Sequence, residues 1–81
     1  MSLYFGVAMA TTDWEKLISN LLKAELKMKG VTYAELADKL AAIGVEEKEA
    51  NIRNKLARGR FSAVFLAQCL KAVGSERLRL D

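Results

Sequence analysis

The chain has 81 residues, 52% of them hydrophobic and 28% charged, with a single cysteine and no histidine or proline. These counts exclude an internal disulfide, zinc sites built from cysteine pairs or histidines, and histidine acid–base catalysis. A chain this short buries only about 60% of its unfolded surface, which leaves little room for both a core and a deep catalytic cleft. We therefore expect one small domain that is not an enzyme and uses no metal, cofactor or small-molecule substrate. The cysteine content suits a reducing compartment, so a cytoplasmic protein is predicted.

The net charge of +3 is concentrated in one short stretch. Residues 46–49 (Glu-Glu-Lys-Glu) sum to −2, whereas residues 53–60 contain four basic residues and no acid and sum to +4. This distribution permits a polyanionic partner without requiring one. No apolar run approaches the roughly 18 residues of a membrane-spanning helix, so no membrane partner is expected.

The first segment, residues 1–10, is apolar but lacks the basic start of a signal peptide. Two interpretations stay open, a native strand and a leader added in cloning. An apolar chain end is expected to be covered, so we predict burial against residues 75–81 or a second subunit. The tail alternates as Arg77-Leu78-Arg79-Leu80, which is typical of a short strand, with residues 3–7 as its candidate partner.

Residues 11–74 carry helical patterns that are punctuated by glycines. The first helix is predicted to begin at the capping box Thr12-Asp13-Trp14-Glu15 and to end near Gly30. The second begins at another capping box, Thr32-Tyr33-Ala34-Glu35, and ends at Gly44.

The third helix is predicted from about Glu46 to Arg58, with acids in its first turn and bases in its last, as the helix dipole favours. Its thin apolar stripe predicts a surface helix, and about three or four residues join it to the second, as in a helix-turn-helix. The fourth helix begins at Ser62 and is apolar nearly all round, so we expect it to be the central helix.

One side of the third helix carries Ile52 and Leu56, and helical spacing places Asn51, Asn54 and Arg58 on the other. Such a helix fits the major groove, where an asparagine pairs with adenine through two hydrogen bonds and nearby cations contact phosphates.

The stretch from about Leu21 to Val73 resembles the lambda-repressor-like (Cro/repressor, XRE-type) helix-turn-helix domains of bacterial and phage regulators. The matching signals are Gly30-Val31-Thr32-Tyr33-Ala34-Glu35-Leu36-Ala37, Leu40, Gly44-Val45, Leu56-Ala57-Arg58-Gly59-Arg60 and Leu70-Lys71-Ala72-Val73-Gly74. The resemblance implies an all-α fold of four to five short helices, with the third helix as the DNA-reading helix. It also implies a homodimer bound to double-stranded operator DNA.

Three departures from the family pattern affect the site. Tyr33 replaces the usual phosphate-clamping glutamine, and its hydroxyl offers the same hydrogen bond. The interval from Gly44 to Gly59 is about three residues longer than usual, and the third helix begins with acids that oppose the negative field of DNA. Either the added residues form an extended turn that holds the acids away from the groove, or DNA binding has been lost.

We predict a small sequence-specific DNA-binding transcription regulator. The predicted base contacts are Asn51, Asn54 and Lys48. The predicted phosphate contacts are Tyr33, Arg53, Lys55, Arg58 and Arg60. The alternative is a protein-interaction module that keeps the helix-turn-helix fold without binding DNA and uses Glu46, Glu47 and Glu49 in its surface.

Other conspicuous side chains have simpler interpretations. Trp14, Phe61 and Phe65 are expected in the core or at its edge, and Cys69 as a buried apolar residue. The lysines near the end of the first helix, which are Lys23, Lys27 and Lys29, either extend the basic face or complement the helix dipole.

Overall fold

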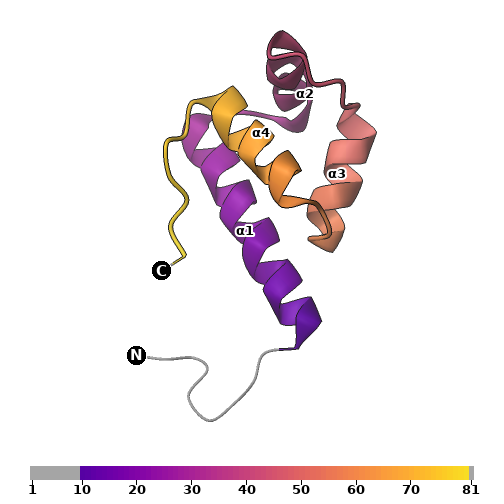
Figure 1. The fold of residues 1–81 in the computed structure, drawn as a ribbon, viewed down its shortest axis with the longest axis vertical. Helices are drawn as coiled ribbons and strands as arrows, with labels where there is room; N and C mark the ends of the chain where they lie inside the picture. The colour runs from indigo at the N-terminus through magenta and orange to yellow at the C-terminus, as the bar shows by residue number, and fades with distance from the viewer. Residues whose placement is uncertain (1–9, 81) are drawn as a thin grey trace.

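The computed structural model describes residues 10–80 and confirms the predicted all-α fold (Figure 1). Its helices are α1 (Thr11–Lys29), α2 (Tyr33–Ala42), α3 (Glu49–Arg58) and α4 (Ala63–Val73). Both α1 and α2 pack against α3 and α4. The N-terminal end of α1 extends beyond the other helices (Figure 1).

Each helix contributes two side chains, spaced four residues apart, to one buried core. The pairs are Leu22 and Leu26, Leu36 and Leu40, Ile52 and Leu56, and Phe65 and Cys69. Residues four apart lie above one another on a helix, so each helix presents a short apolar stripe to the centre. Burial of Cys69 confirms its predicted place in the core.

The caps of α2 and α4 form as the sequence predicts. The Thr32 hydroxyl accepts a hydrogen bond from the Glu35 backbone N–H (3.1 Å), and the Glu35 carboxylate accepts one from the Thr32 N–H (2.8 Å). The Ser62 hydroxyl accepts from the Phe65 N–H at 3.0 Å. These contacts satisfy backbone donors that have no partner within the helix.

The predicted start of α1 is wrong. The helix begins at Thr11, with Ala10 as the N-cap residue, and Asp13 accepts a hydrogen bond from the Ala10 backbone N–H at 3.3 Å. A carboxylate three residues into a helix needs only a backbone donor, which any residue other than proline supplies. The Thr12 hydroxyl is therefore not required for the cap.

The start of α3 also differs from the prediction. Lys48 is the N-cap residue, so the connection from α2 covers residues 43–48, longer than predicted. Gly44 has a φ of +83°, and the Val45 N–H bonds back to the Leu40 carbonyl at 2.9 Å. Val45 packs against the core, which draws this segment away from a helical path. Residues 43–48 therefore form an irregular connection between α2 and α3.

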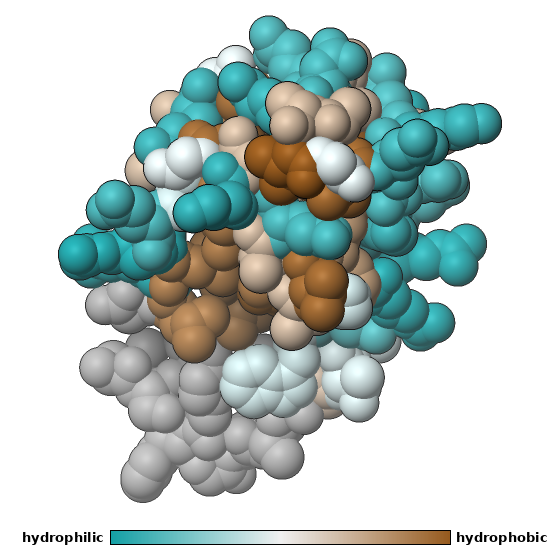
Figure 2. Space-filling model, turned by 45° about the horizontal axis from the view of Figure 1, so that its top comes forward, coloured by the Kyte–Doolittle hydropathy of each residue, from teal (hydrophilic) through white to brown (hydrophobic). Residues whose placement is uncertain are grey.

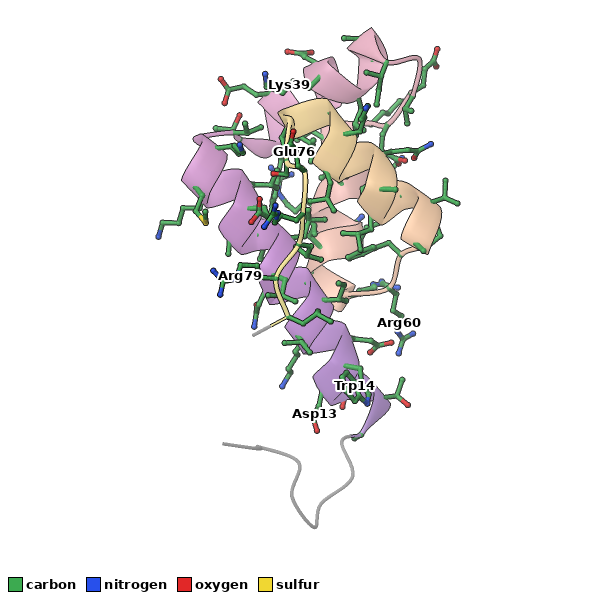
Figure 3. All side chains as sticks on the ribbon, turned by 60° about the vertical axis from the view of Figure 1, so that its left-hand side comes forward. Asp13, Trp14, Lys39, Arg60, Glu76 and Arg79 are labelled. Atoms are coloured by element: carbon green, nitrogen blue, oxygen red, sulfur yellow. The ribbon has the colours of Figure 1, made fainter. Side chains whose placement is uncertain are left out.

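Three further predictions need correction. Helix α4 is not central, because Val64 is 65% exposed and its buried side chains are Phe65 and Cys69. Trp14 is 50% exposed, because it lies on the end of α1 that the other helices do not reach (Figure 3). Residues 75–80 form no strand, and Ser75 instead donates a hydrogen bond to Glu25 of α1 at 2.6 Å. The candidate partner strand, residues 3–7, and the predicted burial of the apolar segment concern residues 1–9, which lie outside the described part.

The C-terminal end of α3 is fixed closely against α1. The Ser19 hydroxyl donates to the Leu56 carbonyl, and Arg60 Nε pairs with Glu15 at 3.0 Å. Gly59 lies so near α1 that a Cβ atom there would be 2.1 Å from the Glu15 carbonyl oxygen. These contacts leave the opposite side of α3 facing outward.

Candidate nucleic-acid interface

The outward side of α3 carries amides, alanines and an arginine. Ile52 and Leu56 are buried, while the exposed residues include Asn51, Asn54 and Arg58. At about 100° per residue, Asn54 lies nearly opposite the two buried side chains. Ala50 and Ala57 are also exposed, so the backbone can approach a partner closely there. The structure thus brings both predicted asparagines onto one face, with Lys48 exposed at its N-terminal end.

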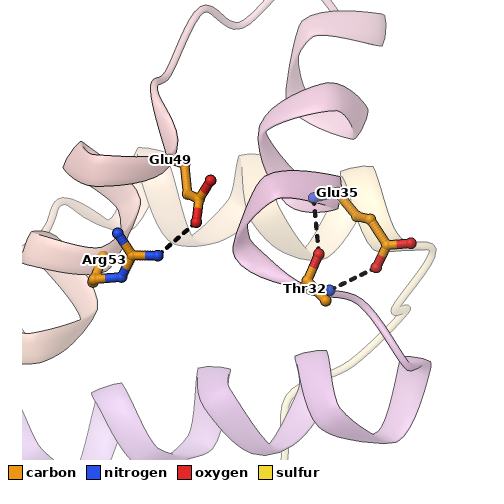
Figure 4. A network of polar contacts seen from close by, with 4 residues as sticks. All are labelled: Thr32, Glu35, Glu49 and Arg53. Atoms are coloured by element: carbon orange, nitrogen blue, oxygen red, sulfur yellow. Dashed lines mark hydrogen bonds and ion pairs between the residues drawn. The ribbon is translucent and has the colours of Figure 1, made fainter.

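The acids near the start of α3 are mostly paired. Glu49 binds Arg53 at 2.5 Å (Figure 4), and Glu47 binds Lys55 Nζ at 2.9 Å. The Glu47 side chain is only 14% exposed. Glu46 is exposed and has no hydrogen bond or ion pair within residues 10–80.

These ion pairs occupy two of the predicted phosphate contacts, Arg53 and Lys55. Lys55 is turned inward, because its ammonium group also lies 4.4 Å from the centre of the Phe65 ring. The Arg53 guanidinium is held by Glu49 and lies 5.8 Å from the centre of the Tyr33 ring. Helical spacing could have indicated the Glu49–Arg53 pair, because the two residues are four apart on α3. It could not have assigned Glu47 to Lys55, because that pair depends on the path of residues 43–48.

The remaining predicted cations gather at the C-terminal end of α3. A hollow of about 300 Å³ is lined by Asn54, Lys55, Arg58 and Arg60. Arg58 has no partner within the described residues, while Arg60 reaches back toward α1 and its ion pair with Glu15 (Figure 3). The Arg60 side chain is 68% exposed, and an exposed ion pair of this kind is easily exchanged.

A second hollow lies where α1 meets the start of α2. It has a volume of about 320 Å³ and is lined by Lys23, Leu26, Lys27, Val31, Thr32 and Tyr33. Nearby, the Thr32 backbone and side-chain hydrogen bonds lower the pKa of Glu35, so its carboxylate stays charged and bonded to the cap. The sequence indicated Tyr33 here, but it gave the two lysines no definite role.

Comparison with known proteins shows the family to which the chain belongs. Residues 14–78 match the family described as a domain of unknown function, DUF6471. The chain belongs to the DUF6471 family. No curated protein and no solved structure matches it. The matched range contains every predicted contact residue, so the candidate interface is part of the DUF6471 domain.

The DUF6471 domain also has an acidic hollow between α2 and the turn before α3. This hollow measures about 410 Å³. Its lining residues are Ala37, Asp38, Ala41, Glu46, Glu47, Lys48 and Asn51. Since Asn51 borders it, acidic groups lie directly beside the amide face of α3.

Between residues 10 and 80, no group of cysteine, aspartate and glutamate side chains is arranged to hold a metal ion. The lone thiol, Cys69, is buried, and burial raises its pKa to about 12, with the Glu47 charge adding to the effect. No helix in that range combines the length and apolar character that a membrane crossing requires.

Proposed function

We propose that this DUF6471 domain is a small sequence-specific DNA-binding transcription regulator whose α3 helix enters the major groove. The observation that carries the proposal is the exposed face of α3, from which Asn51, Asn54 and Arg58 project. A helix with side chains fits the width of the major groove, and asparagine amides match the hydrogen-bonding edge of adenine. The resemblance to lambda-repressor-like domains supports the same orientation.

The ion pairs of α3 support the proposal electrostatically. A reading helix that begins with free carboxylates would lose affinity in the negative field of DNA. Here Glu47 is paired with Lys55, and Glu49 is paired with Arg53. Their charges are largely balanced before a duplex arrives, which leaves the amides and Arg58 to act at the surface.

We further propose a cytoplasmic homodimer, with each subunit reading one half-site. Large apolar side chains that remain exposed are available for contact between subunits. They are Trp14, Met28, Ile43, Val64 and Leu80. Figure 2 shows brown apolar areas among the hydrophilic teal surface. These side chains come from different elements, so none of them alone defines the subunit interface.

The experiment that tests this function selects duplexes from a random pool and then measures Kd by fluorescence anisotropy. Asn51→Ala and Asn54→Ala should each weaken binding to the selected duplex by ~5- to 150-fold, the equivalent of ~1–3 kcal/mol for a lost bidentate base contact. Gln68→Ala, on α4, removes an amide away from α3 and should bind as the wild type does. Equal affinity of wild type and both asparagine variants for every duplex would contradict the proposal.

The acidic hollow favours a second candidate, a protein-interaction module that receives a basic segment of a partner. The same assay separates the two functions through Asp38→Asn combined with Glu46→Gln. If α3 reads DNA, removing these two charges should strengthen duplex binding. If the hollow receives a protein, the wild type should bind no duplex at low salt but should bind a lysine-rich peptide, and the double variant should lose that peptide.

A further inference from the structure

We propose that Lys23 and Lys27 of α1 form, with Thr32 and Tyr33, a binding site for the sugar-phosphate backbone of DNA. This inference rests on the proposed function, and it adds residues of α1 to an interface predicted from α2, α3 and the loop that follows α3. One backbone strand would lie at this site, and the other would lie at the hollow beside Arg58.

The chemistry of the hollow suits a nucleotide backbone. Lys23 and Lys27, one helical turn apart, and Tyr33 line it. Lysine ammonium groups and a tyrosine hydroxyl can donate hydrogen bonds to phosphate oxygens. Leu26 and Val31 supply apolar lining against which the carbon atoms of a deoxyribose can pack.

The hollow that contains Lys23 and the hollow beside Arg58 both lie next to α3. Tyr33 lines the hollow and contacts Arg53, whereas Lys55 lines the hollow beside Arg58. Arg53 and Lys55 are two residues apart, which places them about 160° apart around the helix. Figure 4 shows Arg53 on the side of α3 that faces Thr32. The two hollows therefore flank α3 on opposite sides, as do the two backbones that border a major groove about 12 Å wide.

Lys23 and Lys27 are exposed and have no hydrogen bond or ion pair within residues 10–80. Arg53 and Lys55, in contrast, already bind carboxylates. Glu35 occupies the Thr32 N–H, so the start of α2 does not offer that donor and the site depends on the two lysines.

The test is the salt dependence of Kd for the duplex selected by the wild-type protein. Each lost phosphate contact lowers the log–log slope by about 0.9, so Lys23→Gln combined with Lys27→Gln should reduce its magnitude by about 1.8. The ratio of Kd values for the selected duplex and a scrambled duplex should stay near the wild-type ratio, because phosphate contacts carry little sequence information.

The matched control is Lys71→Gln combined with Arg77→Gln. It removes the same amount of positive charge, but from α4 and the tail. The tail contacts α1 at Glu25, which lies about 160° around that helix from Lys23, so these charges are far from the proposed site. A wild-type slope in the control and a reduced slope in the test variant would support the site. If the slope is unchanged in the test variant, or falls equally in the test and control variants, the site at Lys23 and Lys27 is wrong. That result would leave the proposed DNA binding itself intact. A wild type that binds no duplex would overturn the proposed function itself.

Discussion

Gly59, the residue that caps the C-terminal end of α3, lies close to the backbone of α1. It has a φ of +65°, and a Cβ atom would meet the Glu15 carbonyl oxygen, carbon and Cα. Gly30 has nearly the same conformation, with a φ of +67°, but no atom lies within 4 Å of its Cβ position. The two glycines therefore separate the effect of conformation from the effect of close contact.

We predict that Gly30→Ala lowers the free energy of unfolding by ~1–2 kcal/mol, which is the cost of a left-handed conformation for alanine. Gly59→Ala should lower it by more, on the order of 3 kcal/mol, because α1 and α3 must also move apart. Urea unfolding followed by circular dichroism measures both changes. Equal losses in the two variants would mean that the close approach at Gly59 contributes nothing to stability.

At the scale of the helix, the capping box of α2 makes stability depend on pH. Hydrogen bonds from Thr32 lower the pKa of Glu35 in the folded chain, whereas the unfolded chain has the ordinary value. The unfolded chain therefore binds the proton more tightly, so this contribution is present above the ordinary pKa and is lost as the pH falls through the lowered one.

Glu35→Gln should consequently flatten the decline of stability in acid. Unfolding free energies measured in urea between about pH 6 and 2.5 provide the test, since this range spans the ordinary carboxyl pKa. Thr32→Ala should show the same flattening and a further loss of ~0.5–2 kcal/mol at neutral pH, because the N-cap hydroxyl is gone. Parallel curves for wild type and Glu35→Gln would argue against the capping contact.

The elements differ in how far local sequence determines them. The start of α2, the start of α4 and the buried pairs were predictable, because caps and four-residue spacing are local signals. The start of α3 was not, because Glu46 and Glu47 suit a first helical turn, while Val45 packs in the core and Glu47 turns back to Lys55. The core contact of Val45 forms only after the helices assemble.

The residues of the candidate site also differ in how far local sequence determines their positions. Helical spacing was sufficient to place Asn51, Asn54 and Arg58 together on α3, because one helix sets their positions. The inward turn of Lys55 required knowledge of the neighbouring helix that carries Phe65. The hollow that contains Lys23 required the packing of α1 beside residues 31–33, and no local pattern reports that packing.

Over the whole molecule, the described charges divide into distinct regions around α3. Cationic hollows lie on two flanks, near Tyr33 and near Arg58, and an acidic hollow lies by the turn that precedes the helix. Duplex phosphates would favour the first two regions and avoid the third. This distribution predicts one orientation of the domain on DNA, with the acidic hollow held away from the backbones.

The most direct measurement is an NMR titration of the ¹⁵N-labelled domain with the selected duplex. We predict that the largest changes in backbone amide shifts fall on α3, at Asn51, Asn54 and Arg58, with further changes near Tyr33 and Lys27. Amides of α4 and the tail should change little. Changes centred on α4 or the tail, or no change at low salt, would contradict the claim that α3 lies against the duplex.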